Sequence, residues 1–471
     1  MLQDLNNSTI CAPATAVGHG AIAVIRVSGP SALEIVSKIF VSLKGRKLDQ
    51  MKGYTMCYGS ISAGVGNLLD DAIVAVFRAP ESYTGQDMVE IYSHCSPYIV
   101  SKILELLVSY GCRYAEPGEF TKRAFLNGKM DLAQAEAVAD VIASETEAAH
   151  KIAIRQLKGG FSKELAQMRT QLLKIVSLME LELDFSEEDV EFADREQLKA
   201  LLEKTSSHVS ELISSFKLGN AIKNGVPVAI VGNTNSGKST LLNALLGENR
   251  AIVSDIAGTT RDTIEETCNL DGVLFRFIDT AGLRQSDDTI ERIGIERAYE
   301  KLSAAQLVLA MLDLTQPLGD LLASASHIAD RATDGQQLVF LLNKADAVSV
   351  SVSTAARRAF SPLLAAPGRQ LYTISAKAGL GLEDLRHALA ATWRDLDTAA
   401  ETSLVTNARH LAALQNAATA LRRVRDGLGT CPTDLLAQDL RESLYHLGSI
   451  TGEITPDEVL GNIFRNFCIG K

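Results

Sequence analysis

The sequence predicts a multidomain protein of mixed α/β and α class, in which an α/β domain is inserted into a helical domain. The chain has 471 residues, which is too long for one ordinary core and suggests about three domains. Strand-like and helical patterns are mixed up to about residue 118, and beyond it long helical patterns flank an alternating strand–helix segment. Two separate helical arms are the alternative to insertion. We favour insertion, because surface loops tolerate it.

The expected elements follow this division. In residues 1–118, an α+β domain, strand-like runs at Ala21–Val27, Ala72–Phe77 and Met88–Ile91 alternate with helical patterns at Ser31–Phe40 and Pro97–Tyr110. The helical domain is expected in two parts, residues 119–220 and 397–471, because apolar residues recur there at helical spacing. Its helical stretches are Leu132–Leu157, Leu165–Leu183, Ala408–Val424, Pro432–Leu447 and Pro456–Phe467. The acidic stretch Asp184–Glu196 is expected to be a solvated turn and helix start.

Composition limits the classes of protein that fit. Hydrophobic residues make up 46% of the chain, yet no apolar run approaches the roughly 20 residues that span a bilayer. Seven scattered cysteines without a C-x-x-C pair fit neither a disulfide framework nor a zinc site. Because Asp4 and polar residues precede Ile10 in place of a secretory signal, we expect a cytoplasmic location. The net charge of −11 gives no support for RNA binding, although a local basic patch or a partner could supply the contact.

A phosphate-binding loop of the form G-x-x-x-x-G-K-S runs from Gly232 to Ser239. The apolar segment Val228–Val231 before it predicts a buried strand, and Thr240–Leu246 after it predicts a helix start. Glycines let backbone N–H groups close around phosphates at the positive end of that helix. We expect Lys238 to reach the β- and γ-phosphates and the Ser239 hydroxyl to ligate Mg²⁺. The alternative is a chance glycine-rich turn, which the flanking strand and helix disfavour.

Two later loops predict which base is bound. The run Asn343-Lys344-Ala345-Asp346 follows the apolar segment Leu338–Leu342 and has the N-K-x-D form. In this form a carboxylate accepts hydrogen bonds from N1–H and the exocyclic amine of guanine, so Asp346 is predicted to select GTP. The run Ser375-Ala376-Lys377 follows the strand-like Leu371–Ile374 and is expected to pack the base from its other side.

Two further motifs lie between these loops. Asp279-Thr280-Ala281-Gly282 has the form D-x-x-G, in which the carboxylate holds Mg²⁺ through water and the glycine N–H senses the γ-phosphate. Gly258–Asp262 lies where a switch threonine belongs. Five motifs in the correct order predict a P-loop, Ras-like GTPase domain over residues 221–396. Its predicted nucleotide-binding residues are Asn235, Ser236, Gly237, Lys238, Ser239, Thr240, Ser254, Asp255, Ile256, Ala257, Gly258, Thr259, Thr260, Asp279, Thr280, Ala281, Gly282, Asn343, Lys344, Asp346, Ser375, Ala376 and Lys377.

The motifs alone leave the water-orienting group open. Small signalling GTPases carry a glutamine directly after D-x-x-G, where this chain has Leu283. Arg261 and Arg284 are candidates for an arginine finger, with ordinary surface arginines as the alternative. A monovalent cation could instead neutralise charge between the phosphates. Its ligands would be the Asn235 side chain and carbonyls of Ser254 and Ile256.

Three stretches outside this domain indicate which GTPase family the chain resembles. They read A-I-A-V-I-R-V-S-G-P at Ala21–Pro30, P-G-E-F-T-K-R-A-F-L-N-G-K-M-D-L at Pro117–Leu132 and C-I-G-K at Cys468–Lys471. Together they resemble the MnmE (TrmE) family of tRNA-modification GTPases, from about residue 8 to the C-terminus. The second and third stretches are highly specific to that family.

This resemblance implies a tetrahydrofolate-binding N-terminal domain that forms a homodimer, a helical domain and the inserted GTPase domain. It implies that the chain binds the FAD-containing flavoprotein MnmG (GidA) in a heterotetramer. The two proteins together would install a carboxymethylaminomethyl or aminomethyl group on C5 of the wobble uridine, U34, of certain tRNAs. The one-carbon donor would be 5-formyl- or 5,10-methylene-tetrahydrofolate. The family's GTPase domains pair during hydrolysis in a potassium-dependent way.

The resemblance also implies roles for individual residues. Asn235, Ser254, Ile256 and Thr259 would ligate K⁺, Ser239 and Thr260 would ligate Mg²⁺, and Glu291 would position the water that Leu283 cannot. Arg26, Glu90, Lys129 and Lys471 match the family's folate-binding positions, where each alone could be a surface charge. Cys468 could take or pass a one-carbon unit as a thiolate, or could pack with Ile463, Phe464 and Phe467.

Two other functions share the nucleotide motifs. The runner-up is a GTP-dependent ribosome-assembly factor without covalent chemistry, which has no evident use for a folate-like domain or a C-I-G-K tail. A signalling switch conflicts with Leu283 and with long helical arms. We therefore expect an enzyme subunit whose GTP hydrolysis drives conformational change during wobble-uridine modification.

Overall fold

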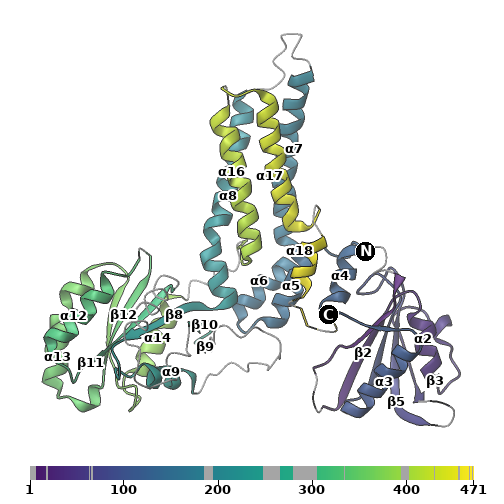
Figure 1. The fold of residues 1–471 in the computed structure, drawn as a ribbon, viewed down its shortest axis with the longest axis horizontal. Coiled ribbons are helices and arrows are strands. Elements are labelled where there is room, and N and C mark those ends of the chain that lie inside the picture. Colours follow the sequence, from purple (N-terminus) through teal and green to yellow (C-terminus); the bar gives the residue numbers. More distant parts are fainter. Residues whose placement is uncertain are drawn as a thin grey trace. The chain divides into compact units, whose positions relative to one another are not determined.

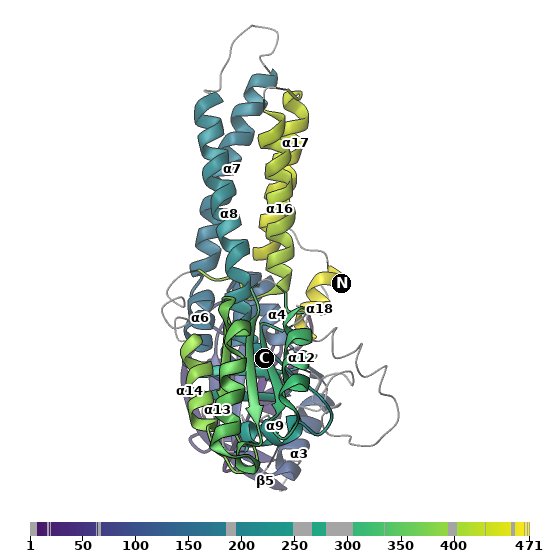
Figure 2. The same cartoon turned by 90° about the vertical axis from the view of Figure 1, so that its left-hand side faces the viewer.

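The computed structural model divides the chain into two compact units (Figures 1 and 2). It describes residues 7–16, 18, 20–62, 64, 67–184, 195–247, 266–278, 305–333, 335–393, 403–428, 430–453, 457–465, 467, 468 and 470. One unit comprises Met1–Ile142, Ile154–Ser206 and Asn416–Lys471, and the other comprises Ala143–Ala153 and Ser207–Gln415. The boundaries expected at residues 118, 220 and 396 stay predictions. Within the described ranges, every helix is too short or too polar to cross a membrane.

The first unit begins with a seven-stranded sheet in the order β3-β4-β5-β6-β2-β1-β7. Its strands are β1 (Ile10–Pro13), β2 (Ile22–Ser28), β3 (Phe40–Ser42), β4 (Thr55–Ser62), β5 (Leu68–Phe77), β6 (Met88–His94) and β7 (Arg113–Tyr114). Helices α2 (Ala32–Ile39) and α3 (Pro97–Ser109) pack on one face, where Val36 and Ile103 meet Val74 and Ile91 in one core. The strands and helices expected in residues 1–118 are confirmed. The prediction omits β1, β3, β4 and β7, which are short or mix glycine and polar residues with apolar ones.

The opposite face of this sheet carries a row of partly exposed apolar side chains. Tyr58 of β4 lies in register with Ile73 of β5, Ile73 with Tyr92 of β6, and Tyr92 with Val24 of β2. Tyr58 is 52% exposed and Ile73 is 40% exposed. Their strand neighbours point into the core, because successive side chains of a strand alternate between faces. Contiguous exposed apolar side chains are typical of an interaction surface.

A buried ion network holds α4 (Glu119–Leu126) in place. Glu119 Oε1 accepts hydrogen bonds from Arg123 Nη2 at 2.9 Å and Arg113 Nη2 at 2.6 Å, and Arg123 Nη1 donates to the Ser8 carbonyl at 2.7 Å. Glu119 is 1% exposed and Arg123 is fully buried. Burial alone would raise the pKa of Glu119, but the hydrogen bonds with the two arginines hold that pKa below its ordinary value. Each buried charge therefore depends on its partner.

The helices of the first unit come from both sides of the α/β segment. They include α5 (Leu132–Ala143), α7 (Gly160–Asp184), α17 (Thr433–Thr451) and α18 (Asp457–Phe464). Helix α17 packs along α7, and Arg169 of α7 forms an ion pair with Glu453. Helices α8 (Arg195–Asn224) and α16 (Ala408–Gly427) continue from this unit into the second. The expected insertion of an α/β domain between two helical parts is confirmed.

The helical stretch expected over Leu132–Leu157 is divided in two. Helix α5 ends at Ala143 and α6 spans Glu147–Leu157. The Thr146 hydroxyl accepts a hydrogen bond from the Ala149 N–H at 3.2 Å, as a threonine does when it caps a helix start. This cap outweighs the apolar periodicity that runs across it. In the acidic stretch, residues 185–194 lie outside the described part of the chain.

The second unit contains a six-stranded sheet in the order β13-β12-β11-β8-β10-β9. The strands β8 (Val226–Gly232), β10 (Val273–Phe277), β11 (Leu307–Asp313), β12 (Gln337–Asn343) and β13 (Arg369–Thr373) are parallel, and β9 (Glu266–Leu270) is antiparallel to β10. Helices α9 (Lys238–Leu246) and α14 (Leu382–Thr392) cover one face, and α12 (Leu318–Ala329) and α13 (Val350–Ala359) cover the other. In such sheets ligands bind at the carboxyl ends of the strands.

Replacing Glu119 by glutamine is expected to lower the free energy of unfolding by about 3–5 kcal/mol at neutral pH, because Arg123 would stay buried without its carboxylate. The folded-state pKa of Glu119 is depressed, so its contribution is present above the unfolded pKa and is lost as pH falls through the folded one. Denaturant unfolding of Glu119→Gln and the unmodified protein, from neutral to acidic pH, checks this. The difference should shrink in acid, and a constant difference would contradict the electrostatic account.

Candidate functional site

The phosphate loop joins the end of β8 to the start of α9, and its two glycines are required by close contacts. A Cβ at Gly232 would lie 2.3 Å from the Met311 carbonyl oxygen. A Cβ at Gly237, whose φ is +100°, would lie 2.2 Å from Asn343 Nδ2. The backbone can therefore approach its neighbours only without side chains at these positions. This leaves the loop free to turn its N–H groups towards an anion.

The Lys238 ammonium lies over this loop. Its Nζ donates to the carbonyls of Gly232 and Asn233, each at 2.8 Å. Burial lowers the pKa of Lys238. A partly desolvated ammonium interacts more strongly with phosphate oxygens than one in water. Its position at the first residue of α9 suits the predicted contact with the β- and γ-phosphates.

Asn343 joins the phosphate loop to the base-binding loops. It lies at the end of β12 and is 2% exposed. Its Nδ2 donates to the Ser236 carbonyl at 2.8 Å, and its Oδ1 accepts from the Ala376 N–H at 2.9 Å. One amide thereby ties together three segments that sequence reasoning treated separately. Sequence reasoning predicted a nucleotide contact for Asn343, and the structure adds this tie between loops.

Asp346 is presented to solvent in the ionised form that guanine recognition needs. Its Oδ1 accepts a 2.6 Å hydrogen bond from Ser375 Oγ, and this bond is the main cause of the lowered pKa of Asp346. A carboxylate has about four lone-pair sites, so acceptor capacity remains for guanine N–H groups. Lys344, with a left-handed φ of 64°, donates to Asp313 Oδ2 at 2.6 Å and fixes the turn before Asp346.

The other described residues of the predicted nucleotide site are mostly accessible. Asn235 has a φ of 60°, and its side chain is exposed, as are those of Ser239, Thr240 and Lys377. The Ser239 hydroxyl at the start of α9 suits a magnesium ligand. Ser236 Oγ is buried without a hydrogen-bond partner among the described residues. The predicted residues that lie outside the described part are Ser254, Asp255, Ile256, Ala257, Gly258, Thr259, Thr260, Asp279, Thr280, Ala281, Gly282, Glu291 and Lys471, with Arg261, Leu283 and Arg284.

A second polar site lies on the outer face of the N-terminal sheet, where Arg26 of β2 is in register with Glu90 of β6. Arg26 Nε and Nη2 donate to Glu90 Oε1 at 3.0 and 2.8 Å, and both side chains are largely buried. The Arg26 guanidinium carbon lies 5.3 Å from the ring centre of Tyr83 and 5.6 Å from that of Phe120. The structure therefore brings two predicted folate ligands together beside two aromatic rings.

The C-terminal segment reaches this ion pair through Gly470. Arg26 Nη1 donates to the Gly470 carbonyl at 3.2 Å. Gly470 has a φ of +92°, and a Cβ there would lie 2.1 Å from the Pro13 carbonyl oxygen. The Gly118 N–H donates to the Cys468 carbonyl at 3.4 Å, which anchors the same segment. The glycine of C-I-G-K is thus required for this close approach to β1.

Cys468 and Lys129 are both exposed, and neither has a described contact with the Arg26–Glu90 ion pair. Phe464 and Phe467 pack with Leu132, whereas Cys468 is exposed and lies outside that buried cluster, which disfavours its packing alternative. The proposed thiolate chemistry stays a prediction. Lys129 is exposed, and its Nζ donates to the Pro80 carbonyl at 3.0 Å. No described contact joins Lys129 to Arg26 or Glu90.

Sequence reasoning missed the surroundings of Arg26. Tyr92 Oη donates to Glu90 Oε2 at 2.8 Å, and burial, followed by Glu90, raises the pKa of Tyr92 to about 12. A signal for Tyr92 existed, because residues two apart on a strand share a face. Tyr83, Phe120 and the Gly470 carbonyl offered no such signal, since their contacts with Arg26 join distant parts of the chain.

A doubly wound sheet, a phosphate loop and an N-K-x-D loop held beside it by Asn343 are together typical of a P-loop GTPase. Residues 132–468 match the model of the MnmE helical domain, and residues 9–129 match the model of the GTP-binding protein TrmE N-terminus. The chain belongs to the MnmE (TrmE) family of tRNA modification GTPases.

Relatives of the whole chain carry the same description. The tRNA modification GTPase MnmE of Parabacteroides distasonis is 52% identical over 98% of this chain and 100% of its own length. Those of Bacteroides thetaiotaomicron and Porphyromonas gingivalis are 50% and 48% identical, over 99% and 100% of this chain and 100% of their own lengths. Among solved structures, the G domain of the T. maritima FeoB iron transporter matches 35% of this chain and 97% of its own, at 24% identity and a TM-score of 0.26.

Replacing Asp346 by asparagine is expected to weaken GTP binding by about 10²- to 10⁴-fold, because two hydrogen bonds to a charged group are lost, each contributing about 1.5–3 kcal/mol. Xanthosine triphosphate should bind Asp346→Asn better than it binds the unmodified protein, because the amide N–H can donate to its C2 oxygen. Fluorescence titration with both nucleotides measures this, with Asp320→Asn on α12 as control. If Asp346→Asn binds GTP with unchanged affinity, Asp346 does not take part in recognition of the base.

Proposed function

We propose that this chain is the GTP-hydrolysing subunit of a system that places a carboxymethylaminomethyl or aminomethyl group on C5 of the wobble uridine, U34, of tRNA. Membership of a family of tRNA modification GTPases supports the broader part of this proposal. The observation that carries the finer part is the hydrogen bond from Arg26 to Gly470, which joins the C-terminal motif to a polar site in the unit that lacks the phosphate loop. A GTPase without covalent chemistry has no evident need for such a site.

The residues around Arg26 suit a tetrahydrofolate derivative, which would supply the one-carbon unit when bound. Arg26 uses three of its five N–H donors on Glu90 and Gly470, so two remain for pterin or glutamate oxygens. Glu90 retains lone pairs for the N–H groups of an aminopyrimidine. The rings of Tyr83 and Phe120 provide apolar surface for a flat heterocycle. Lys129 and Lys471 complete the proposed set of ligands.

The phosphate loop suits the two proposed cations. The exposed Ser239 hydroxyl would ligate Mg²⁺ together with Thr260, and the exposed Asn235 side chain would ligate K⁺ together with Ser254, Ile256 and Thr259. A cation there would neutralise charge that develops between the phosphates during hydrolysis. Glu291 is proposed to position the attacking water. A Glu291→Ala variant that loses GTP affinity along with turnover would contradict that role.

The apolar row Val24–Tyr92–Ile73–Tyr58 supports a homodimer formed by the N-terminal sheets, because burying it would remove exposed aromatic and aliphatic surface from water. We further propose that two chains bind two copies of the FAD-containing flavoprotein MnmG, in the cytoplasm. All seven cysteines are free, as expected for a reducing compartment. A molar mass of one chain by sedimentation equilibrium would contradict the homodimer.

If K⁺ takes the proposed place, GTP turnover in potassium salt should exceed turnover in sodium salt by about 10²- to 10³-fold, the range expected for one electrostatic stabiliser. Asn235→Ala should abolish the difference while retaining GTP binding, because Lys238 and the loop N–H groups still hold the phosphates. Steady-state phosphate release in matched KCl and NaCl measures both. Equal rates in the two salts for the unmodified protein would rule out the cation.

If Arg26 binds the folate, Arg26→Ala should weaken binding of 5-formyl-tetrahydrofolate by about 10- to 100-fold, the loss expected for hydrogen bonds to a charged group. Arg46→Ala removes an exposed arginine of the same domain and serves as the matched control. Isothermal titration of the full chain gives both affinities. Equal binding by Arg26→Ala and Arg46→Ala would show that the ion pair with Glu90 is structural.

A further inference from the structure

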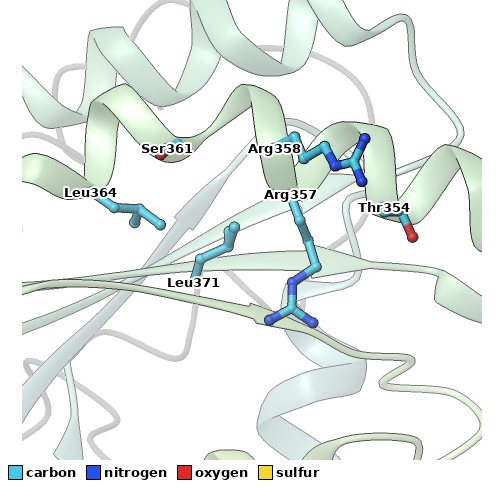
Figure 3. A pocket seen from close by; sticks show the side chains of 6 residues that line it. All are labelled: Thr354, Arg357, Arg358, Ser361, Leu364 and Leu371. Carbon is cyan, nitrogen blue, oxygen red and sulfur yellow. The ribbon is translucent and has the colours of Figure 1, made fainter.

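A surface hollow of about 630 Å³ lies on the second unit, where α13 meets η3 (Ser361–Ala365) and β13. It is lined by Thr354, Arg357, Arg358, Ser361, Leu364 and Leu371 (Figure 3). The leucines are half-buried, and the other four residues are exposed. The hollow therefore combines a small apolar floor with two cations and two hydroxyl groups at its margin. None of the described nucleotide motifs contributes a residue to its lining.

The two arginines have no anionic partner within the described part of the chain. Neither Arg357 nor Arg358 takes part in an ion pair there, whereas Arg26, Arg113 and Arg423 each do. From Asp346 to Glu383 the chain has no intervening aspartate or glutamate, yet it carries Arg357, Arg358, Arg369 and Lys377. The whole chain has 57 acidic residues against 46 basic ones, so this stretch reverses the overall balance. The stretch is therefore locally basic in a chain that is acidic overall.

The two guanidinium groups point apart. Adjacent residues of a helix do not face each other, and Figure 3 shows Arg357 extending past Leu371 while Arg358 lies beside Thr354. A single small anion would engage one of them. Two cations that point apart at the margin of one hollow suit an extended chain of anions, in which neighbouring charges are held some distance apart.

We propose that this patch, defined as Arg357, Arg358 and the hollow between α13 and β13, binds the phosphate backbone of tRNA. The proposal rests on the function proposed above, which makes tRNA the substrate of the system. Arginine matches phosphate geometry through paired N–H donors, and a hydroxyl such as that of Ser361 adds a further donor. An acidic chain repels RNA overall, so it needs a local positive surface to hold a phosphate backbone.

An acidic protein surface is the competing partner, and two features favour RNA. The elements around the patch, α13, η3 and β13, contain no aspartate or glutamate. A polyanion can therefore lie along this surface without meeting a like charge, which favours RNA over a protein that offers only one or two carboxylates. The half-buried Leu364 and Leu371 offer only a small apolar surface, of a size that suits the face of a ribose or base. A protein partner would be expected to find a larger apolar surface.

The test is tRNA binding by the full chain at several salt concentrations, measured by fluorescence anisotropy of end-labelled tRNA. Arg357→Ala/Arg358→Ala should bind about tenfold more weakly, and its plot of log affinity against log salt should be shallower by about 2, because two phosphate contacts are lost. Arg422→Ala/Arg425→Ala removes two exposed arginines from α16 and is the matched control, expected to behave like the unmodified chain. Unchanged affinity for a guanine nucleotide verifies that each variant is folded.

The contrary outcomes are distinct. If the unmodified chain binds tRNA and Arg357→Ala/Arg358→Ala binds it with the same affinity and slope, the patch proposal is overturned while the proposed function stands. If that variant keeps tRNA binding but loses the flavoprotein partner, the patch is a protein contact and the RNA proposal is overturned. If the unmodified chain binds no tRNA at the lowest salt, the patch proposal is overturned, and the wobble-uridine content of cellular tRNA decides the proposed function separately.

Discussion

The Arg26 guanidinium is the point on which the first unit depends, because it holds together β2, β6 and the C-terminal segment. It bonds to Glu90 across the sheet and to Gly470 from the far end of the chain. A charge this well buried needs its partners, since losing one leaves the other uncompensated. The C-terminal segment can reach it only because Gly118 and Gly470 have no side chains where Phe464 and Pro13 approach. The same guanidinium keeps two N–H donors free, so a structural tie and a ligand site share one residue.

The second unit is organised by a single amide in a comparable way. Asn343 connects the phosphate loop through Ser236 and the base-binding loop through Ala376, so the two halves of a nucleotide site are set relative to each other before any ligand binds. Preorganisation of this kind lowers the entropy that binding must overcome. The Lys238 ammonium is already held over the loop by two carbonyls. Both units thus present binding groups that are fixed by hydrogen bonds inside the protein.

The sequence predicted local features well and long-range contacts poorly. The phosphate loop, the strands β8, β12 and β13 and the insertion follow from strand and helix periodicity and from short motifs, which depend on neighbouring residues, whereas β9 and β11 were not predicted. The break between α5 and α6 was missed because one threonine cap outweighed a continuous apolar pattern. Arg26 and Glu90 were assigned to one binding site by resemblance, but their ion pair and the contacts of Arg26 with Tyr83, Phe120 and Gly470 appear only in the folded chain. The net charge of −11 did not predict where a basic patch would lie, because net charge averages over the whole surface and one region can differ from that average.

The central claim is that this chain serves wobble-uridine modification through one unit that hydrolyses GTP and another that handles a one-carbon donor. Nucleoside mass spectrometry of bulk tRNA, from cells with and without the chain, tests it most directly. The account predicts that C5-aminomethyl-type wobble uridines disappear without the chain, return with the unmodified chain and do not return with Arg26→Ala. Unchanged tRNA in cells that lack the chain would contradict the account and favour a GTP-dependent ribosome-assembly factor.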